Sequence, residues 1–341
     1  MPTNKEKILD LLQDRVVTLA ITIAVMFIVC SIIWPDRFPT FDNISLVLLN
    51  LSIESIVAVG MMILLISGAF DLSVGSVVAF AGGLTGYLMY YWGVYVPVAI
   101  LAGLGASVVI GLINGVFVAK IGINPLIQTL AMMGIVRGGA LMVSGAGIQN
   151  FPDSFNAIGQ TKILGVQSPV WFMLLIVLIF SILVSKTIFF RRYYYIGGNE
   201  KAARLSGIRV DKMKIIAFII ISTLAGFAGI LLASRLGAAM STSGRGLELR
   251  AIAAVVLGGA SLLGGQGKII GALLGTIFMG LVSNIMILAR VSGYWQEIVL
   301  GLILIIAVTI DIVLKKRVGV TPKAYVKKVT KPIEKQQVKS T

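Results

Sequence analysis

Long apolar segments recur along the whole chain, and they constrain its fold more than any other feature. Ten such segments can be drawn in the 341 residues, at 16–34, 44–66, 72–91, 94–118, 126–143, 170–189, 213–235, 249–263, 268–289 and 297–314. Several approach the twenty residues that a helix needs to cross the hydrocarbon core of a bilayer. The pattern predicts an all-α polytopic membrane protein with about ten transmembrane helices, in one domain over residues 16–314.

The composition agrees with this class and excludes several kinds of chemistry. Hydrophobic residues make up 57% of the chain and charged residues 13%, with a mean hydropathy of +0.98; soluble domains carry about a quarter charged residues. The sequence has no His and a single cysteine, Cys30. His-based acid–base catalysis, His metal ligands and internal disulfides are therefore excluded. We expect no catalytic residue, no metal site and no cofactor.

The distribution of basic residues predicts the orientation. If residues 1–15 are a cytoplasmic segment and the chain crosses ten times, 22 of the 29 Lys and Arg residues fall on the cytoplasmic side and 7 on the outer side. This bias favours two cytoplasmic termini. Residues 315–341 then form a basic cytoplasmic tail. The tail lacks aromatic interleaving and any nucleic-acid motif, so we expect it to anchor at the lipid bilayer and bind no nucleic acid.

Two of the apolar segments are candidates for broken or re-entrant helices. The segment at 249–263 is short, and the one at 72–91 is rich in glycine. Residues 251–265 predict a Gly/Ala-rich helix, the kind that lets helix backbones touch in a bilayer. Residues 68–75 and 259–265 are weakly alike, as the halves of an internally repeated transporter can be. The loop at 144–168 predicts an ordered outer cap that is too short to bind a solute by itself.

A short polar segment at 196–208 interrupts the apolar pattern on the predicted cytoplasmic side. Asn199 is a good helix N-cap and Gly207 a good residue to follow a helix end, so residues 200–206 predict about two helical turns. Ala202, Ala203 and Leu205 would give this helix a small apolar surface. So short a helix is marginal alone in water, which favours docking onto a partner. A basic loop held by lipid headgroups is an equal alternative on the residues alone.

Charged residues within the apolar segments are the first candidates for a solute pathway. Burying a charge in a bilayer costs at least ~2.5 kcal/mol, so such residues normally face a cavity or a partner. Glu54 is favoured to face the pathway, whereas Asp71 is favoured to cap the helix that begins near Leu72. Single amides in membrane helices more often bond to neighbouring helices than to solutes. The candidate pathway residues are Glu54, Asp71, Asn114, Gln128 and Asn284.

ATP binding by this chain is not supported. Gly267-Lys268 matches the end of a phosphate-binding loop, but position 262 is Leu and Ile269 follows the lysine. The spacing of Gly-x4-Gly-Lys-Ser/Thr, whose backbone cradles phosphates, is therefore absent. Any energy from ATP must come through another subunit.

Several ordered motifs together resemble one family. They are Gly197-Gly198-Asn199-Glu200 continuing to Ile208, Gly68-x-x-Asp71-Leu72-Ser73-Val74-Gly75-Ser76, Gly111-Leu112-Ile113-Asn114-Gly115, Arg137-Gly138, and Gly246-x-Glu248-Leu249 followed by residues 251–265. The chain resembles the permease subunit of ribose-type ABC importers of bacteria, over about residues 40–313. The sequence departs from the pattern at Arg250, where the family usually has an acid, and at Glu54, where an uncharged polar residue is common.

The resemblance implies a function and a set of partners. The chain would form half of a path that carries ribose or a similar small hydroxylated solute across the bacterial cytoplasmic membrane. It implies an ABC ATPase subunit inside, an extracytoplasmic sugar-binding protein outside, and a second permease copy in a homodimer or related heterodimer. Within a coupling loop at 190–212, the residues implied to contact the ATPase are Gly198, Asn199, Glu200, Ala202, Ala203, Leu205, Ser206 and Gly207.

A second class of transporter stays open on the residues alone. Glu54 and Asp71 could relay protons in an ion-coupled secondary transporter of a small polar solute. Such a transporter would need no ATPase, and residues 198–208 would be dispensable. An intramembrane enzyme is not supported, because His, cysteine pairs and carboxylate clusters are all absent from the sequence.

Overall fold

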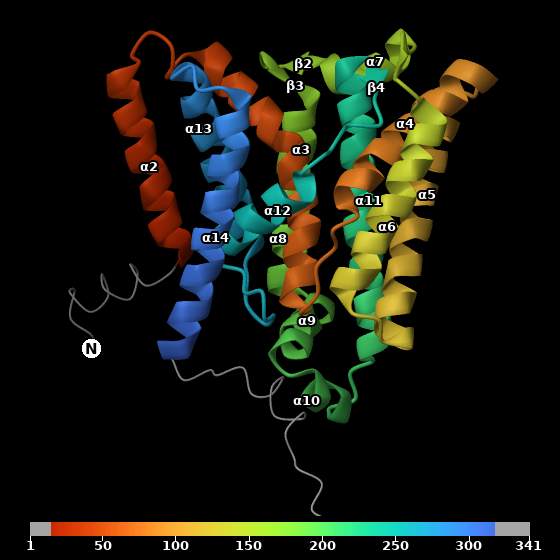
Figure 1. Ribbon diagram of the computed structural model, residues 1–341, viewed down its shortest axis with the longest axis vertical. Helices are drawn as coiled ribbons and strands as arrows, with labels where there is room; N and C mark the ends of the chain where they lie inside the picture. The colour runs from red at the N-terminus through yellow and green to blue at the C-terminus, as the bar shows by residue number, and fades with distance from the viewer. Residues whose placement is uncertain (1–14, 318–341) are drawn as a thin grey trace, which may run out of the picture.

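The computed structural model describes residues 15–317, which are predominantly helical (Figure 1). The predicted N-terminal segment and basic tail lie almost wholly outside the described residues. The α-helices are α2 (Arg15–Ile33), α3 (Phe41–Ile66), α4 (Val74–Trp92), α5 (Val96–Val116), α6 (Pro125–Ser144), α7 (Asp153–Gln160), α8 (Ser168–Lys186), α9 (Ile188–Gly198), α10 (Glu200–Leu205), α11 (Val210–Leu236), α12 (Leu247–Leu257), α13 (Ile269–Leu288) and α14 (Gly293–Arg317). A π-helical turn, η1 (Phe117–Ile121), continues α5.

Seven of the described helices are long and apolar enough to cross a membrane: α2, α3, α5 with η1, α6, α8, α11 and α13. The other three predicted segments are also helical, as α4, α12 and α14, but do not meet the same test of length and hydropathy. The protein is therefore an all-α polytopic membrane protein. The count of ten crossings stays a prediction.

The long helices run side by side between two ends of the molecule (Figure 1). Helices α9 and α10 lie at one end, called the α10 end, where α2 begins and α14 finishes. Helix α7 and the short strands lie at the opposite end, called the α7 end. There β1 (Ile148–Gln149) pairs with β4 (Ala238–Ala239), and β2 (Lys162–Ile163) pairs with β3 (Val166–Gln167), both antiparallel. The ordered cap predicted for 144–168 is thus confirmed.

Helices α3 and α11 form the centre of the bundle. From Leu51 to Ile66 every residue of α3 is buried except Glu54. Helix α11 packs along α5, α4 and α3. Gly111 of α5 lets α5 and α11 come close together. A Cβ at this position would lie only 2.6 Å from the carbonyl oxygen of Phe218 in α11. This close packing lets adjacent helix backbones approach without an intervening side chain.

Two non-helical segments separate membrane helices. Of the two candidate broken segments, 249–263 is broken after Leu257, whereas 72–91 forms the continuous helix α4 and that prediction is wrong. Residues 67–73 are non-helical between α3 and α4, and residues 258–268 are non-helical between α12 and α13. The predicted Gly/Ala helix over 251–265 is wrong in its second half, since α12 ends at Leu257. The φ angles of Gly259, Gly264 and Gly265 are +93°, +88° and +74°, and such left-handed residues cannot continue a right-handed helix. The predicted backbone contact is confirmed, because Gly258 touches the backbone of Gly271.

Candidate coupling and translocation site

The predicted two-turn helix forms at the α10 end, with both predicted caps. The Asn199 Oδ1 accepts a hydrogen bond from the backbone N–H of Ala202 at 3.1 Å, which satisfies one of the free donors of the first turn. After Leu205 the chain turns at Gly207, whose φ angle is +81°. Local residue choice therefore sets where α10 begins and ends.

Ion pairs attach α10 to the start of α11. Glu200 binds Arg204 at 3.0 Å within α10 and Lys214 of α11 at 2.6 Å, and Arg204 also binds Asp211 at 2.5 Å. Partial burial raises the pKa of the Glu200 carboxyl, but Lys214 and Arg204 outweigh it and hold that pKa below its ordinary value. Glu200 is therefore ionised at neutral pH and links the two helices.

The apolar residues of α10 point in different directions. The sequence assigns Ala202, Ala203 and Leu205 to one surface for a partner. Instead Ala203 is only 4% exposed and belongs to the main hydrophobic core of the bundle, while Leu205 is 90% exposed. Ala203 faces inward because the ion pairs lay this side of α10 against α11. A partner can reach Ala202 and Leu205, and Ala203 sets how α10 sits on the rest of the chain.

Both interrupted segments meet the end of α9 at Gly197. A Cβ at Gly197 would collide with the carbonyl oxygen of Ile66 and the amide nitrogen of Gly265. A Cβ at Gly264 would lie 2.9 Å from the Cα atoms of Gly197 and Gly68. The Gly265 N–H also donates to the Ile66 carbonyl at 2.9 Å. Glycine at these positions lets the three backbones touch, so α9 contacts both interruptions directly.

Three of the five candidate pathway residues form one buried network. Asp71 Oδ1 accepts from the backbone N–H of Ser73 at 2.7 Å and from its hydroxyl, and the Asn114 side-chain amide donates to Asp71 Oδ2 at 3.3 Å. The Gln128 amide in turn donates to Asn114 Oδ1 at 3.2 Å. Asp71 and Asn114 are fully buried and Gln128 is 8% exposed. The network ties the turn before α4 to α5 and α6. Asp71 does not cap α4 directly, because the N-cap is Ser73 and Asp71 bonds to Ser73 rather than to a first-turn N–H of the helix.

The other charged candidate, Glu54, is paired. Its Oε1 lies 2.9 Å from Nε of Arg250, so α3 and α12 are joined by an ion pair. The two side chains are 22% and 29% exposed. The Arg250 Nε–H makes no hydrogen bond within the described residues, so the contact is ionic. Glu54 and Arg250, the two residues that depart from the ribose-type pattern, therefore contact each other.

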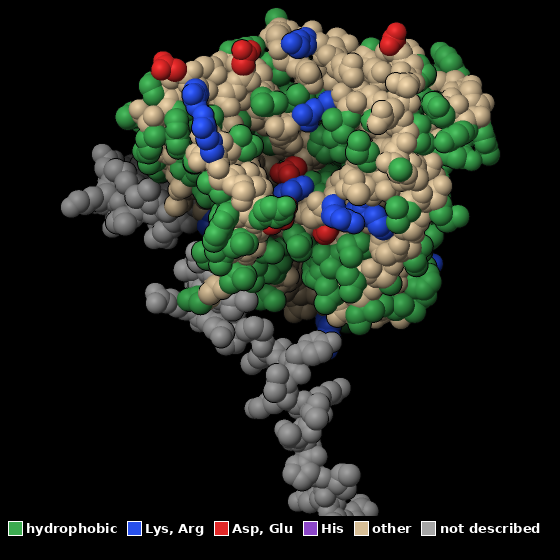
Figure 2. Space-filling view, turned by 45° about the horizontal axis from the view of Figure 1, so that its top comes forward, with side chains coloured by type: hydrophobic (Ala, Val, Ile, Leu, Met, Phe, Trp, Pro, Cys, Tyr) green, Lys and Arg blue, Asp and Glu red, His purple; other side chains and the backbone are tan. Residues whose placement is uncertain are grey.

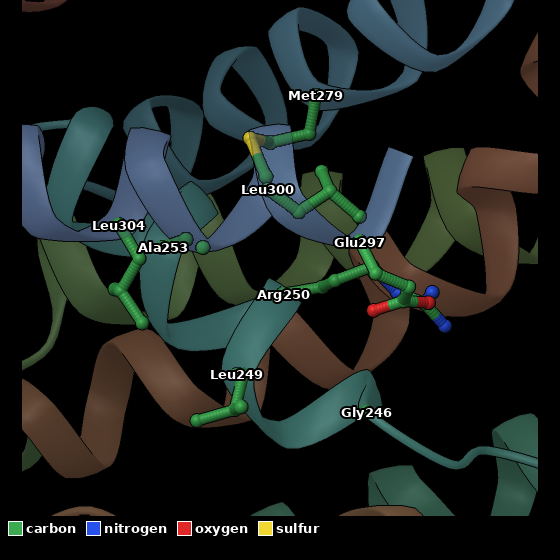
Figure 3. A pocket seen from close by; sticks show the side chains of 9 residues that line it. Gly246, Leu249, Arg250, Ala253, Met279, Glu297, Leu300 and Leu304 are labelled. Atoms are coloured by element: carbon green, nitrogen blue, oxygen red, sulfur yellow. The ribbon is translucent and has the colours of Figure 1, made fainter. Parts of the chain in front are cut away.

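Cavities flank this ion pair. One of about 150 Å³ is lined by Glu54, Asn50 and Asn284 among others. The other, of about 90 Å³, lies between α12 and α14, and the side chains of Arg250 and Glu297 reach toward the same edge of it (Figure 3). The face at the α7 end is hollowed, with acidic and basic side chains at the floor of the hollow (Figure 2). Each cavity has a mostly apolar lining into which a few carboxylate, guanidinium or amide groups project.

Asn284 lies with Glu54 and apart from the Asp71 network. It forms two hydrogen bonds with Asn43, of 3.2 and 2.8 Å, that join α13 to α3. The five candidates thus separate into two groups, a network at the start of α4 and a cavity beside α3.

Comparison with known proteins gives the family. A family model described as "Branched-chain amino acid transport system / permease component" matches residues 43–308. The chain belongs to this permease family. It is 43% identical over 296 residues to the L-arabinose transport system permease protein AraH of Escherichia coli, covering 85% of this chain and 88% of that one.

Other relatives of the permease have different names. It is 39% identical over 298 residues to the ribose import permease protein RbsC of Escherichia coli, covering 85% of this chain and 92% of that one. It is 34% identical over 293 residues to the autoinducer 2 import system permease protein LsrC of Salmonella paratyphi B, covering 84% of each. No solved structure matches the permease.

Several residues of the site were missed by the sequence reasoning. Tyr194 donates its hydroxyl to the Gly267 carbonyl at 2.8 Å and adds a second contact between α9 and the second interruption. Asn43 and Asn50 add amides to the cavity beside Glu54. Glu248, in the second signature motif of the permease, touches Gly75 of the first. No spacing in the sequence indicates these contacts, because each joins segments far apart in the chain.

Proposed function

We propose that this permease carries a sugar, or a similar small hydroxylated solute, across the bacterial cytoplasmic membrane as part of an ABC importer. The printed names of its relatives support this solute class, since they concern arabinose, ribose and autoinducer 2. The observation that carries the proposal is the contact of α9 with both interrupted segments at Gly197. Through this contact, a movement of α9 at one end of the molecule would be passed to the two interrupted segments of the bundle.

The coupling begins at the exposed side of α10. An ATPase subunit that binds Ala202 and Leu205 would move α10, and the ion pairs of Glu200 would carry the movement to α11. At the same time α9 would press on residues 67–73 and 258–268 through Gly197. These segments lead to the Asp71 network and to the helix that carries Arg250. A packed, bistable arrangement of this kind converts a small displacement at one site into a helix shift at another.

The solute path runs beside Glu54 and Arg250. The cavities next to this pair hold carboxylate, guanidinium and amide groups, which can replace the water around sugar hydroxyls. Asp71, Asn114 and Gln128 instead position the start of α4, because their polar groups bond to one another and are buried. A second copy of the permease would complete the path, and a homodimer would offer the ATPase pair two equivalent α10 helices.

The orientation follows from the same account. With α10 toward the ATPase, the α10 end is cytoplasmic and both ends of the chain are cytoplasmic, after ten crossings. The α7 end then faces outward, where an extracytoplasmic sugar-binding protein would deliver solute to the hollow of Figure 2. Most Lys and Arg residues then lie on the cytoplasmic side, as is usual for membrane proteins.

Reconstitution tests the proposal. The full-length permease is placed in liposomes with its ABC ATPase subunit and sugar-binding protein, and uptake of radiolabelled arabinose and ribose is measured with and without ATP. Uptake of at least one sugar that needs both the ATPase and ATP supports the proposal. Accumulation driven by a proton gradient without the ATPase would contradict it and support the ion-coupled alternative.

A further inference from the structure

A basic cavity opens between α9 and α11 at the α10 end, apart from the contacts at Gly197. Its volume is about 600 Å³, and it is lined by residues of α9, the turn after α10 and the first turns of α11. Arg192, Arg209 and Lys212 line it, and no acidic residue does. The cavity therefore brings together three positive charges, one from α9 and two from the start of α11.

These charges are not neutralised by the surrounding acids. Glu200 and Asp211 are the nearby carboxylates. Glu200 pairs with Arg204 and Lys214, and Asp211 pairs with Arg204. Within residues 15–317, no ion pair or side-chain hydrogen bond involves Arg192, Arg209 or Lys212, and all three are exposed. Their positive charges remain available to an anion from outside the chain.

The same two helices add apolar side chains to the lining, next to the membrane helix α8 on α9 and one turn further along α11. Ile188 and Phe189 are 73% and 36% exposed, and Ile188 follows the end of the membrane helix α8 by two residues. Ile216 contributes from the second turn of α11. A free anion would leave these side chains uncovered, whereas a molecule with an anionic head and an apolar chain would contact both the cations and the apolar side chains.

We propose that this cavity binds the headgroup phosphate of an anionic phospholipid, with an acyl chain along Ile188, Phe189 and Ile216. Basic pockets between membrane helices on the cytoplasmic side suit such headgroups. The bound lipid would join α9 to α11 beside α10. The site depends on the permease alone, so it does not rest on the solute or the ATPase proposed above.

Native mass spectrometry of the full-length permease in detergent tests the site. The probe is dioleoyl phosphatidylglycerol, and dioleoyl phosphatidylcholine has the same chains with a zwitterionic head. We expect preferential retention of phosphatidylglycerol, weakened roughly fivefold for each cation removed in a variant carrying R192Q, R209Q and K212Q. A matched control carries R37Q, K162Q and R290Q, which change three exposed cations that do not line the cavity.

A second variant distinguishes a loss of lipid binding from a loss of folding. Ile188→Ser leaves every charge in place and changes a largely exposed side chain, so the variant should fold normally. It should nevertheless bind phosphatidylglycerol more weakly, because the acyl chain loses its contact with Ile188. Equal retention of the two lipids by the unmodified permease, or unchanged retention by the triple variant, would overturn the proposal. Displacement of the lipid by millimolar glycerol phosphate would assign the site to a soluble phosphate instead. Unchanged lipid retention with lost ATPase binding would assign it to an acidic protein surface.

Discussion

Glu54 on α3 and Arg250 on α12 form an ion pair, with 2.9 Å between Oε1 and Nε. The pair accounts for two charges within membrane segments, because each charge lowers the cost of burying the other. It also fixes the short helix α12 to the central helix α3. Helix α12 follows the loop at residues 240–246, after β4. The pair therefore joins the second interrupted segment to the core beside the proposed solute path.

Removing either partner should cost more than removing both. Arg250→Gln leaves the Glu54 carboxylate half-buried without its cation, and we expect a loss of about 1–3 kcal/mol in stability. Glu54→Gln with Arg250→Gln should recover part of that loss. A double-mutant cycle from thermal unfolding of the detergent-purified variants measures the difference. Strictly additive effects would show that the two side chains do not interact.

The contact of Gly264 with Gly197 and Gly68 gives a test of transmission. Gly264→Ala places a Cβ 2.9 Å from both Cα atoms, at a φ angle of +88° that alanine adopts with strain of about 1–3 kcal/mol. We expect ATPase binding to persist, because α10 is unchanged, while uptake falls several-fold at equal membrane levels. Gly105→Ala is the control, since a Cβ there meets no atom within 4 Å. Normal uptake by the Gly264 variant would remove this contact from the mechanism.

The Glu200 ion pairs predict a pH dependence. The folded-state pKa of Glu200 lies below its ordinary value of about 4.3, so its contribution is complete above that value and is lost as the pH falls through the folded pKa. Because the side chain is 41% exposed, we expect about 0.5 kcal/mol. Thermal unfolding of the protein and of Glu200→Gln should differ at pH 7 and converge near pH 3. A difference that persists at pH 3 would show that the charge is not its source.

The proposed orientation can be tested with reporters. A reporter that is active only outside the cytoplasm should be silent when it is fused after Thr341. The same reporter inserted after Gly165, in the hairpin at the α7 end, should be active. The opposite pattern would place the α10 end outside and separate it from any cytoplasmic ATPase.

Features set by neighbouring residues could be predicted from the sequence. The limits of α10 follow from Asn199 and Gly207, which act within one or two turns of the helix. The interruption after residue 66 contains Gly68, whose φ angle of +83° cannot continue a right-handed helix. The inward direction of Ala203 could not be predicted, because it depends on ion pairs with α11. The pairing of Glu54 with Arg250 and the meeting of Gly197 with Gly264 join distant segments, and hydropathy carries no information about such pairs.

We propose that the exposed side of α10 receives the ATPase. Leu205 is 90% exposed on α10, so the described residues of the permease leave it uncovered for a partner. Leu205→Glu keeps α10 in place, since the side chain contacts little of the permease. Leu164→Glu is the matched control, because Leu164 is 83% exposed at the opposite end.

The decisive measurement is co-purification of the ATPase subunit with the permease from membranes that contain equal amounts of each variant. We expect Leu205→Glu to reduce ATPase recovery about tenfold or more, the loss expected when a central apolar anchor is replaced by a charge. Leu164→Glu should retain the ATPase as the unmodified permease does. Full ATPase recovery with Leu205→Glu would contradict the account, because α10 would then not be the surface through which ATP drives transport.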